Sequence, residues 1–455
     1  MQTTSILYWT CMRLVVFNAR MQSESAAVQT ADLAWMLVAT ALVLLMTPAL
    51  AFFYGGMVRS KNALNTMMMS LAVIGPVAVV WALLGYSLAF APGSPVIGHL
   101  DFAALAHVGL ESRQGIPHLL FMAFQGTFAI IAVALISGAV VERMRFTAYV
   151  VFAIAWTLLV YAPVAHWIWG GGFLAADGAL DFAGGTVIHV NAAAAAGVAA
   201  LVIGPRRDYG RHALLPHNVP FTLLGTGLLW FGWFGFNAGS ALGASPQAAL
   251  AFVNTMLAPA ATLSAWIALD LLRGGRITAI GAATAVVVGL VVITPAAGYV
   301  GPRDAIIIGL LGAVPSYYAL LYRTRTRLDD ALDVVAAHGT GGATGAILTG
   351  IFANPAWSGG AQGLLAGHPA QVVVQVSGLL LVAAYSAAAT FVILRLIAVL
   401  IPLRIPPRIE GIGLDVTEHG EEAYTTGDGA ILVRPGALQP RALGTPVSAT
   451  PGGAQ

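Results

Sequence analysis

Two histidines follow an aspartate at the same spacing in two distant parts of the chain. Asp181 precedes His189 by eight residues, and Asp330 precedes His338 by eight residues. A run of small residues follows each histidine. A neutral imidazole offers one hydrogen-bond donor and one acceptor, and its pKa near neutrality lets a pair of rings relay a proton. The repeat therefore predicts a site built from two histidines.

The composition indicates that these residues lie in a membrane. Hydrophobic residues make up 58% of the 455 positions and charged residues 9%, whereas a soluble globular chain carries about 25% charged residues. Such a chain has too few polar side chains to cover a water-exposed surface. The 52 glycines fit transmembrane helices whose backbones approach closely. Lys and Arg are scattered in short clusters rather than along one face, so we expect no nucleic-acid partner.

Apolar stretches of roughly 17–25 residues can cross the hydrocarbon core of a bilayer as helices. The chain contains eleven such stretches, and the last is the longest. They are expected at 33–57, 63–90, 117–140, 146–168, 184–203, 219–240, 248–271, 279–297, 304–322, 334–353 and 370–402. We therefore expect an all-α membrane protein with eleven transmembrane helices.

The basic residues of the connecting loops predict the orientation, because cytoplasmic loops are enriched in Lys and Arg. One set of alternate loops holds Arg59, Lys61, Arg143, Arg145, Arg206, Arg207, Arg211, Arg273, Arg276, Arg323, Arg325 and Arg327. The opposite set holds Arg113 and Arg303. This asymmetry predicts an N-terminus outside and a C-terminus in the cytoplasm.

The two histidines occupy the fifth and tenth predicted spans, which run in opposite directions. The fold is therefore expected to consist of two inverted five-helix repeats plus a long eleventh helix, as in many transporters. On a continuous helix, eight residues would place each histidine about 12 Å beyond its aspartate. The two imidazoles would then converge near the middle of the bilayer, where transporters of this architecture bind their substrates.

Other interpretations of the histidines are open. A single transmembrane histidine is often a hydrogen-bond partner between helices, although ionisable residues within spans are functional by default. One cysteine, Cys11, excludes a disulfide framework and a multi-Cys metal site. We expect no metal and no cofactor. An enzyme is also disfavoured, because no nucleophile–base pair is apparent and the glycine run at 170–172 precedes no strand.

Three regions are expected along the chain. Residues 1–30 form an extracytoplasmic N-terminal segment, for which Met21 is an alternative start. Residues 31–402 form the transmembrane domain, and 403–455 form a cytoplasmic tail. The tail is rich in Gly and Pro after Gly427 and is expected to be disordered there.

Several motifs resemble the Amt/Mep/Rh ammonium transporters, and in particular their bacterial Amt branch. They are FFYGG at 52–56, AFQGTF at 123–128, HWIWGGG at 166–172, DFAGGTVIH at 181–189, GWFGFNAGS at 232–240 and TPAAGY at 294–299. The resemblance extends from about residue 31 to 424, in the order and with the spacing of the family. It implies ammonium or ammonia transport by a homotrimer in a bacterial plasma (inner) membrane.

The resemblance also implies roles for individual residues. They are an outer substrate-binding site of Phe124, Phe128, Trp169 and Ser240, a pore gate of Phe128 and Phe236, pore histidines His189 and His338, and supporting carboxylates Asp181 and Asp330. Elementary chemistry agrees with such an outer site, because aromatic faces attract a small cation and a hydroxyl accepts one of its N–H groups. The alternative is that these aromatic residues only pack or anchor the helices at the bilayer surface.

Two further alternatives concern the branch and the tail. An Rh-type member would lack the pairing of Trp169 with Ser240. The segment 411–424 resembles the C-terminal segment through which bacterial Amt proteins couple to a PII-type signalling protein, and the alternative is a solvated tail.

An ammonium sensor that acts through a cytoplasmic partner is the competing function. The sequence leaves open whether the transported species is ammonium or ammonia.

Overall fold

The computed structural model describes residues 2–424, with side chains from residue 30 onward. In the expected N-terminal segment 1–30, the side chains of residues 1–29, including the alternative start Met21, lie outside the described part. The Gly- and Pro-rich tail beyond residue 424 also lies outside it.

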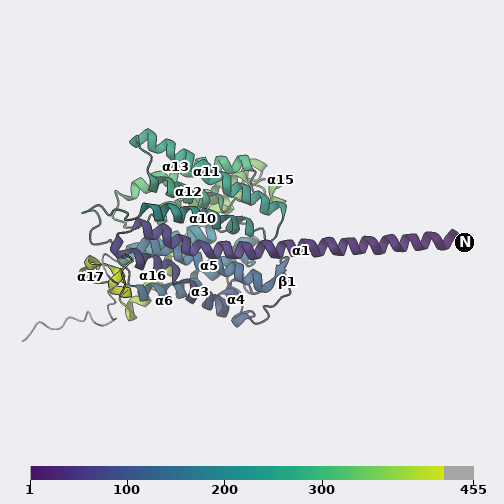
Figure 1. Cartoon of the computed structure of the whole chain (residues 1–455), viewed down its shortest axis with the longest axis horizontal. Helices are drawn as coiled ribbons and strands as arrows, with labels where there is room; N and C mark the ends of the chain where they lie inside the picture. The colour runs from purple at the N-terminus through teal and green to yellow at the C-terminus, as the bar shows by residue number, and fades with distance from the viewer. Residues whose placement is uncertain (1, 425–455) are drawn as a thin grey trace, which may run out of the picture.

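The described chain is mostly helical (Figure 1). The first half contains α1 (Gln2–Met57), η1 (Ser60–Asn62), α2 (Ala63–Leu71), α3 (Ile74–Val80), η2 (Trp81–Gly85), α4 (Tyr86–Phe90), η3 (Ala103–Leu105), α5 (His118–Val140), α6 (Phe146–Trp156), η4 (Thr157–Tyr161), α7 (Ala162–Trp169), α8 (Phe173–Ala176), η5 (Gly185–Val190) and α9 (Asn191–Ile203). Two short antiparallel strands, β1 (Ser112–Arg113) and β2 (Ile116–Pro117), precede α5.

The second half repeats this arrangement of long helices and ends in a short C-terminal segment. It contains α10 (Val219–Gly239), α11 (Pro246–Gly274), α12 (Ala279–Ile293), α13 (Pro302–Arg323), η6 (Val335–Thr340), α14 (Gly341–Phe352), α15 (Pro355–Ser358), η7 (Leu364–Ala366), α16 (Ala370–Leu400), α17 (Pro407–Ile412) and η8 (Asp415–His419). The elements α17 and β1 lie at opposite ends of the bundle (Figure 1).

Each of the eleven predicted spans coincides with a helical segment, and the membrane fold is confirmed. Within residues 30–424, nine helices are long and apolar enough to cross a membrane. The helix α12 has 15 residues, because Thr294 and Pro295 end it earlier than the apolar run suggests. The segment η6–α14 is not among the nine, and it is rich in Gly and Thr. The predicted long eleventh helix is α16, with 31 residues.

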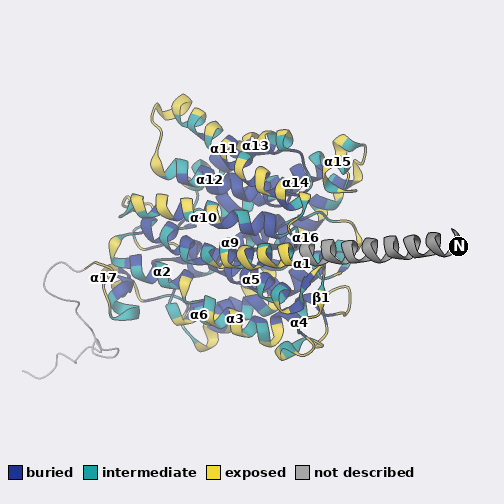
Figure 2. Cartoon of the chain, turned by 45° about the vertical axis from the view of Figure 1, so that its right-hand side comes forward, coloured by how far each residue is buried: buried dark blue, intermediate teal, exposed yellow. Residues whose placement is uncertain are grey.

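The periphery of the bundle is apolar, as lipid requires. Large hydrophobic side chains on its surface are substantially exposed, among them Leu224, Phe231, Leu310 and Phe391. Figure 2 shows the complementary pattern, with buried residues concentrated along the axis of the bundle and exposed residues at its edge. An apolar surface of this extent would be unfavourable in water, and it is suited to contact with lipid.

The helices α1 and α10 pack closely against each other because glycines form their interface. A Cβ atom at Gly225 would lie 2.3 Å from the backbone nitrogen of Phe53, and one at Gly235 would lie 2.8 Å from the carbonyl oxygen of Ala39. A side chain at either position would force the helices apart. This packing brings Phe53, on α1, to the walls of the cavities described below.

The expectation that each aspartate and its histidine share one continuous helix was wrong. Asp181 lies in the turn before η5, and Asp330 lies before η6. Both histidines lie in π-helical turns that continue directly into α9 and α14. The physical reason is that each carboxylate accepts hydrogen bonds from the backbone N–H groups of the helix that follows.

Candidate functional site

Three cavities follow one another through the bundle. The aromatic vestibule is a cavity of about 290 Å³ lined by Gln114, Phe128, Trp169, Asp181, Ser240 and neighbouring residues. The histidine lumen has a volume of only about 10 Å³ and contains His189, Phe236 and His338 in its wall. The basic-face vestibule, of about 230 Å³, is lined by His338, Asp270, Trp266, Tyr317 and other residues near the arginine-rich loops. His338 borders both the lumen and the basic-face vestibule.

Aromatic rings and one hydroxyl meet in the aromatic vestibule. The rings of Phe128 and Trp169 are perpendicular, with centroids 6.0 Å apart. The hydroxyl of Ser240 donates to the carbonyl oxygen of Phe236 over 2.8 Å, so its lone pairs can accept from a ligand. Phe124 is not among the lining residues and instead supports Phe128 in an edge contact at 4.8 Å.

A pair of stacked rings separates the aromatic vestibule from the histidine lumen. The rings of Phe128, on α5, and Phe236, on α10, stack with centroids 4.4 Å apart and an interplanar angle of 22°. Each residue is 1% exposed. In this arrangement the two buried rings lie between the two cavities.

The two histidines meet beyond this pair. Their Nδ1 atoms are 3.2 Å apart, and their rings are nearly parallel with centroids 5.2 Å apart. Since the two nitrogens share one hydrogen bond, one of them carries the proton and the other accepts it. The Nε2 atom of His189 is buried and has no hydrogen-bond partner among the described residues. A lumen lined by this nitrogen can offer a hydrogen bond to a small guest.

One residue of this lumen had no role in the sequence prediction. Trp233 stacks on His189 with ring centroids 5.4 Å apart, and its indole N–H donates to the hydroxyl of Thr294 over 2.9 Å. It thereby fixes the plane of the imidazole. The signal that could have found it is its position one helical turn before Phe236 on α10.

The aspartates act on the backbone. The carboxylate of Asp181 accepts hydrogen bonds from the four consecutive N–H groups of residues 184–187, at 2.7–2.9 Å. The backbone carbonyl oxygen of Asp181 accepts the indole N–H of Trp169 at 2.8 Å. Asp330 accepts one such bond, from the N–H of Val335 at 2.6 Å, and it lines none of the three cavities. Among the described residues, no group of three His, Cys, Asp or Glu side chains could hold a metal.

Buried charges join the loops of the basic face. Glu142 accepts from Arg59 at 2.8 Å and from Arg206 at 2.7 Å, and Arg206 also pairs with Asp329 at 2.8 Å. Burial raises the pKa of Glu142, but the guanidinium groups of Arg206 and Arg59 outweigh burial and hold this pKa below its usual range. Asp329 shows the same balance: burial raises its pKa, but the guanidinium of Arg206 outweighs burial and lowers the pKa. The network therefore ties four loops together.

The C-terminal segment packs on the same face through acidic side chains. The carboxylate of Asp415 accepts from the N–H groups of Leu64, at 3.1 Å, and Asn65, at 2.8 Å. The carboxylate of Glu418 accepts from the N–H of Phe146 at 2.9 Å. These contacts satisfy free N–H groups at the starts of α2 and α6, as N-terminal caps do.

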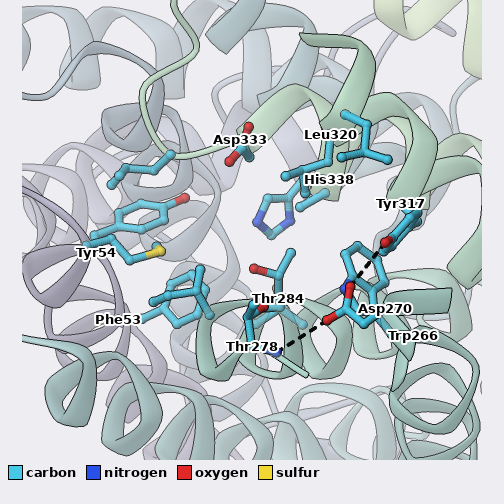
Figure 3. Close-up of a pocket in the computed structure, with 17 residues that line it drawn as sticks. Phe53, Tyr54, Trp266, Asp270, Thr278, Thr284, Tyr317, Leu320, Asp333 and His338 are labelled. Atoms are coloured by element: carbon cyan, nitrogen blue, oxygen red, sulfur yellow. Dashed lines mark hydrogen bonds between the residues drawn. The ribbon is translucent and has the colours of Figure 1, made fainter. Parts of the chain in front are cut away.

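The basic-face vestibule is polar on one wall (Figure 3). Asp270 accepts from the hydroxyl of Tyr317 at 3.1 Å, and more weakly from the N–H of Thr278 at 3.4 Å. Trp266 packs edge-on against Tyr317 with centroids 4.9 Å apart. Sequence reasoning assigned no role to these residues, because they are spread over α11, α12 and α13 and carry no common motif.

Comparison with known proteins agrees with the architecture. Residues 34–424 match the model of the Ammonium Transporter Family. An ammonium transporter of Aquifex aeolicus is 47% identical over 418 residues, which cover 90% of this chain and 97% of the relative. The crystal structure of Candida albicans Mep2 superimposes with a TM-score of 0.79 at 36% identity, over 83% of this chain and 86% of Mep2.

A solved sensor Amt protein is also similar, with a TM-score of 0.81 and 28% identity over 87% of this chain and 99% of the sensor. The family model and the relatives cover the three cavities and the helices that form them. The chain belongs to the ammonium transporter family.

Proposed function

We propose that the three cavities form one transport path, in which ammonium is recruited at the aromatic vestibule, loses a proton at the phenylalanine pair, and crosses the histidine lumen as ammonia. The proton either returns to water in the aromatic vestibule or crosses along the histidine pair. The observation that carries this proposal is the buried histidine pair in a lumen of about 10 Å³. A lumen of this size admits a molecule comparable to water, and its walls are otherwise apolar.

Recruitment depends on Phe128, Trp169 and Ser240. The faces of the two aromatic rings attract a small cation, and the hydroxyl of Ser240 accepts one N–H group. The carboxylate of Asp181 lines the same vestibule, but its oxygens are occupied by four backbone N–H groups. Asp181 therefore makes the region negative and holds Trp169 in place, without contacting the cation.

Selectivity follows from dehydration. Moving a charge into an apolar lumen costs far more than moving a neutral molecule. Ammonium can lose a proton and pass as ammonia, whereas potassium has no neutral form. The pair of His189 and His338 replaces the hydrogen bonds of water, and the relay between their Nδ1 atoms offers a route for the proton.

Topology and partners belong to the same proposal. The arginine-rich face is cytoplasmic, the aromatic vestibule opens outside, and the protein is a homotrimer in a bacterial inner membrane. The 403–424 segment, which packs on the basic face, is the surface that we propose for a PII-type signalling protein. The basic loops support this orientation. A pull-down in which no PII protein binds would contradict the partner.

The proposed function is tested by an ammonium pulse on purified protein in liposomes. We expect a transient current, or a change of internal pH, that is lost in His189→Ala and His338→Ala. A current lost in the variants supports charge-coupled transport. A pH change without current supports ammonia conduction. An equal conductance for potassium would contradict the mechanism.

A sensor function is the second candidate, because the similar solved structures include a sensor Amt protein. A sensor would bind ammonium at the aromatic vestibule and report this to a cytoplasmic partner. Intact protein that binds ammonium but produces neither a current nor a pH change would favour it.

A further inference from the structure

Asp270 is an acidic residue between the end of one helix and the start of the next. It lies near the end of α11, which ends at Gly274, and its carboxylate accepts the N–H of Thr278, the residue that caps α12. The C-terminus of α11 disfavours a carboxylate, whereas the N-terminus of α12 favours one. The side chain of Asp270 is half-buried and lines the basic-face vestibule beside the pore.

The charge of Asp270 is not neutralised by a neighbouring cation. Among the ion pairs of residues 30–424, the other acidic residue of this cavity, Asp333, pairs with Arg323, but none includes Asp270. Arg273, one turn further along α11, lies over the ring of Tyr318 instead, with its guanidinium carbon 5.6 Å from the ring centroid. Asp270 accepts two hydrogen bonds, from Tyr317 and Thr278, and a carboxylate can accept about four.

Aromatic rings stand beside this carboxylate. Trp266 is 4% exposed and Tyr317 7% exposed, and their rings meet edge to face at the wall of the cavity. A Cβ atom at Gly281 would lie 3.1 Å from Oδ2 of Asp270 and 3.2 Å from Nε1 of Trp266. The glycine therefore lets the start of α12 approach both the carboxylate and the indole. Figure 3 shows this group and His338 on the walls of one cavity.

We propose that Asp270, with the rings of Trp266 and Tyr317, forms a second ammonium-binding site at the basic-face mouth of the transport path. The inference rests on the proposed function, because the ligand is the protonated form of the ammonia that this path carries. A carboxylate with unused acceptor capacity beside aromatic rings binds a small cation by charge, hydrogen bonding and cation–π attraction. The site holds ammonium at the end of the path opposite to the aromatic vestibule.

The test compares ammonium transport in right-side-out and everted membrane vesicles, at equal pH on both sides and zero membrane potential. In Asp270→Asn, we expect the half-saturating ammonium concentration to rise roughly tenfold when ammonium is supplied on the basic face, as loss of one charge-assisted contact implies. It stays unchanged when ammonium is supplied on the aromatic side.

The maximal rates provide a second readout. Because net flux must vanish at equal concentrations, the ratio of maximal rate to half-saturating concentration has the same value in both directions. A weakened site at the basic face should therefore raise the maximal rate from that face together with the half-saturating concentration. A residue that merely supports the fold would lower the maximal rate in both directions.

Asp101→Asn is the matched control, since Asp101 is an exposed acidic residue that lines none of the three cavities. It removes one negative charge and should leave both constants unchanged. If Asp270→Asn does not reach the membrane folded, Tyr317→Phe carries the test. This variant keeps the ring but removes the hydroxyl that holds the carboxylate in position, and the expected rise is about threefold.

The outcomes separate the two proposals. A rise confined to the basic face supports the second site. Wild-type constants in the Asp270 and Tyr317 variants, or an equal change from both faces, overturn it while ammonium transport stands. Wild-type vesicles that carry no ammonium in either direction overturn the proposed function and this site with it.

Discussion

The two Asp-x7-His repeats have the same spacing, but their aspartates have different hydrogen-bond partners. Asp181 is saturated by four backbone N–H groups, and no ion pair among the described residues includes it. Asp330 accepts one backbone N–H, and its Oδ1 atom has no hydrogen-bond partner among the described residues. Asp330 also lies next to Asp329, which belongs to the buried charge network of the basic face.

The difference shows that an internal repeat preserves geometry more closely than chemistry. Both halves place a histidine in a π-helical turn, so that the two rings meet. The aspartate of the first half is a rigid cap whose carbonyl oxygen holds Trp169 at the aromatic vestibule. The aspartate of the second half is a weaker cap beside a network of arginines. Substitutions at equivalent positions should therefore have unequal effects.

The largest difference is expected between the stabilities of the variants Asp181→Asn and Asp330→Asn. An amide offers one acceptor oxygen, so Asp181→Asn leaves at least two buried N–H groups without an acceptor, at a cost of about 3 kcal/mol or more. Asp330→Asn should cost about 1 kcal/mol, since one oxygen is enough for its single bond. Thermal unfolding of the purified proteins and ammonium uptake would measure both effects. Equal destabilisation would show that the two caps are equivalent.

The histidines should behave as a unit despite their different neighbours. His189→Ala and His338→Ala each remove the shared Nδ1 contact, and each should lower ammonium transport at least roughly tenfold. The double variant should be little worse than the worse single variant, with a coupling of about 1–2 kcal/mol. Initial rates in liposomes test this cycle. Effects that multiply would mean that the two rings act independently.

A smaller and one-sided effect is expected at the aromatic vestibule. Trp169→Leu removes a cation–π face worth about 1–2 kcal/mol. The half-saturating ammonium concentration should therefore rise about tenfold from the aromatic side and stay constant from the basic face. Phe231→Leu, a substitution at the lipid-exposed surface of α10, is the control. A change of the same size in this control would attribute the effect to general packing.

The smallest effect concerns acid and the basic face. The folded pKa of Glu142 lies below its usual range, so its contribution to stability is present above the unfolded pKa of about 4.3 and is lost as the pH falls through the folded value. The unfolding temperature of the wild type should therefore fall more steeply between about pH 5 and about pH 3 than that of Glu142→Gln. Parallel curves would contradict a role for this ion network.

Much of the architecture could be predicted from the chain alone. Eleven apolar segments, alternating basic loops and the repeated aspartate and histidine led to a bundle with two related halves. Two details were missed for local reasons. Proline and threonine shorten α12, and the aspartates lie before their helices because their carboxylates cap the backbone. Hydropathy does not register such caps, because it measures how apolar a segment is and not where its N–H groups find partners.

The functional sites also differ in how far the sequence could predict them. The aromatic residues and histidines lie in contiguous motifs, so sequence alone could single them out. Trp233 lies in such a motif as well, but its stacking on His189 depends on how α10 faces η5. The group of Asp270, Trp266 and Tyr317 has no contiguous motif, because Trp266 and Asp270 lie one turn apart on α11 and Tyr317 lies on α13. Their proximity depends on the packing of α11, α12 and α13.

The sequence by itself determined that this protein lies in a membrane, how its spans alternate, and which two histidines form a pair. These properties follow from apolar length, loop charge and repeat spacing, which are local and can be counted along the chain. Only the tertiary structure decided that Asp181 is saturated while Asp270 keeps free acceptor capacity. The reason is that hydrogen-bond partners in a helical bundle come from whichever helix lies nearby, and the order of residues along the chain does not reveal which helices are neighbours.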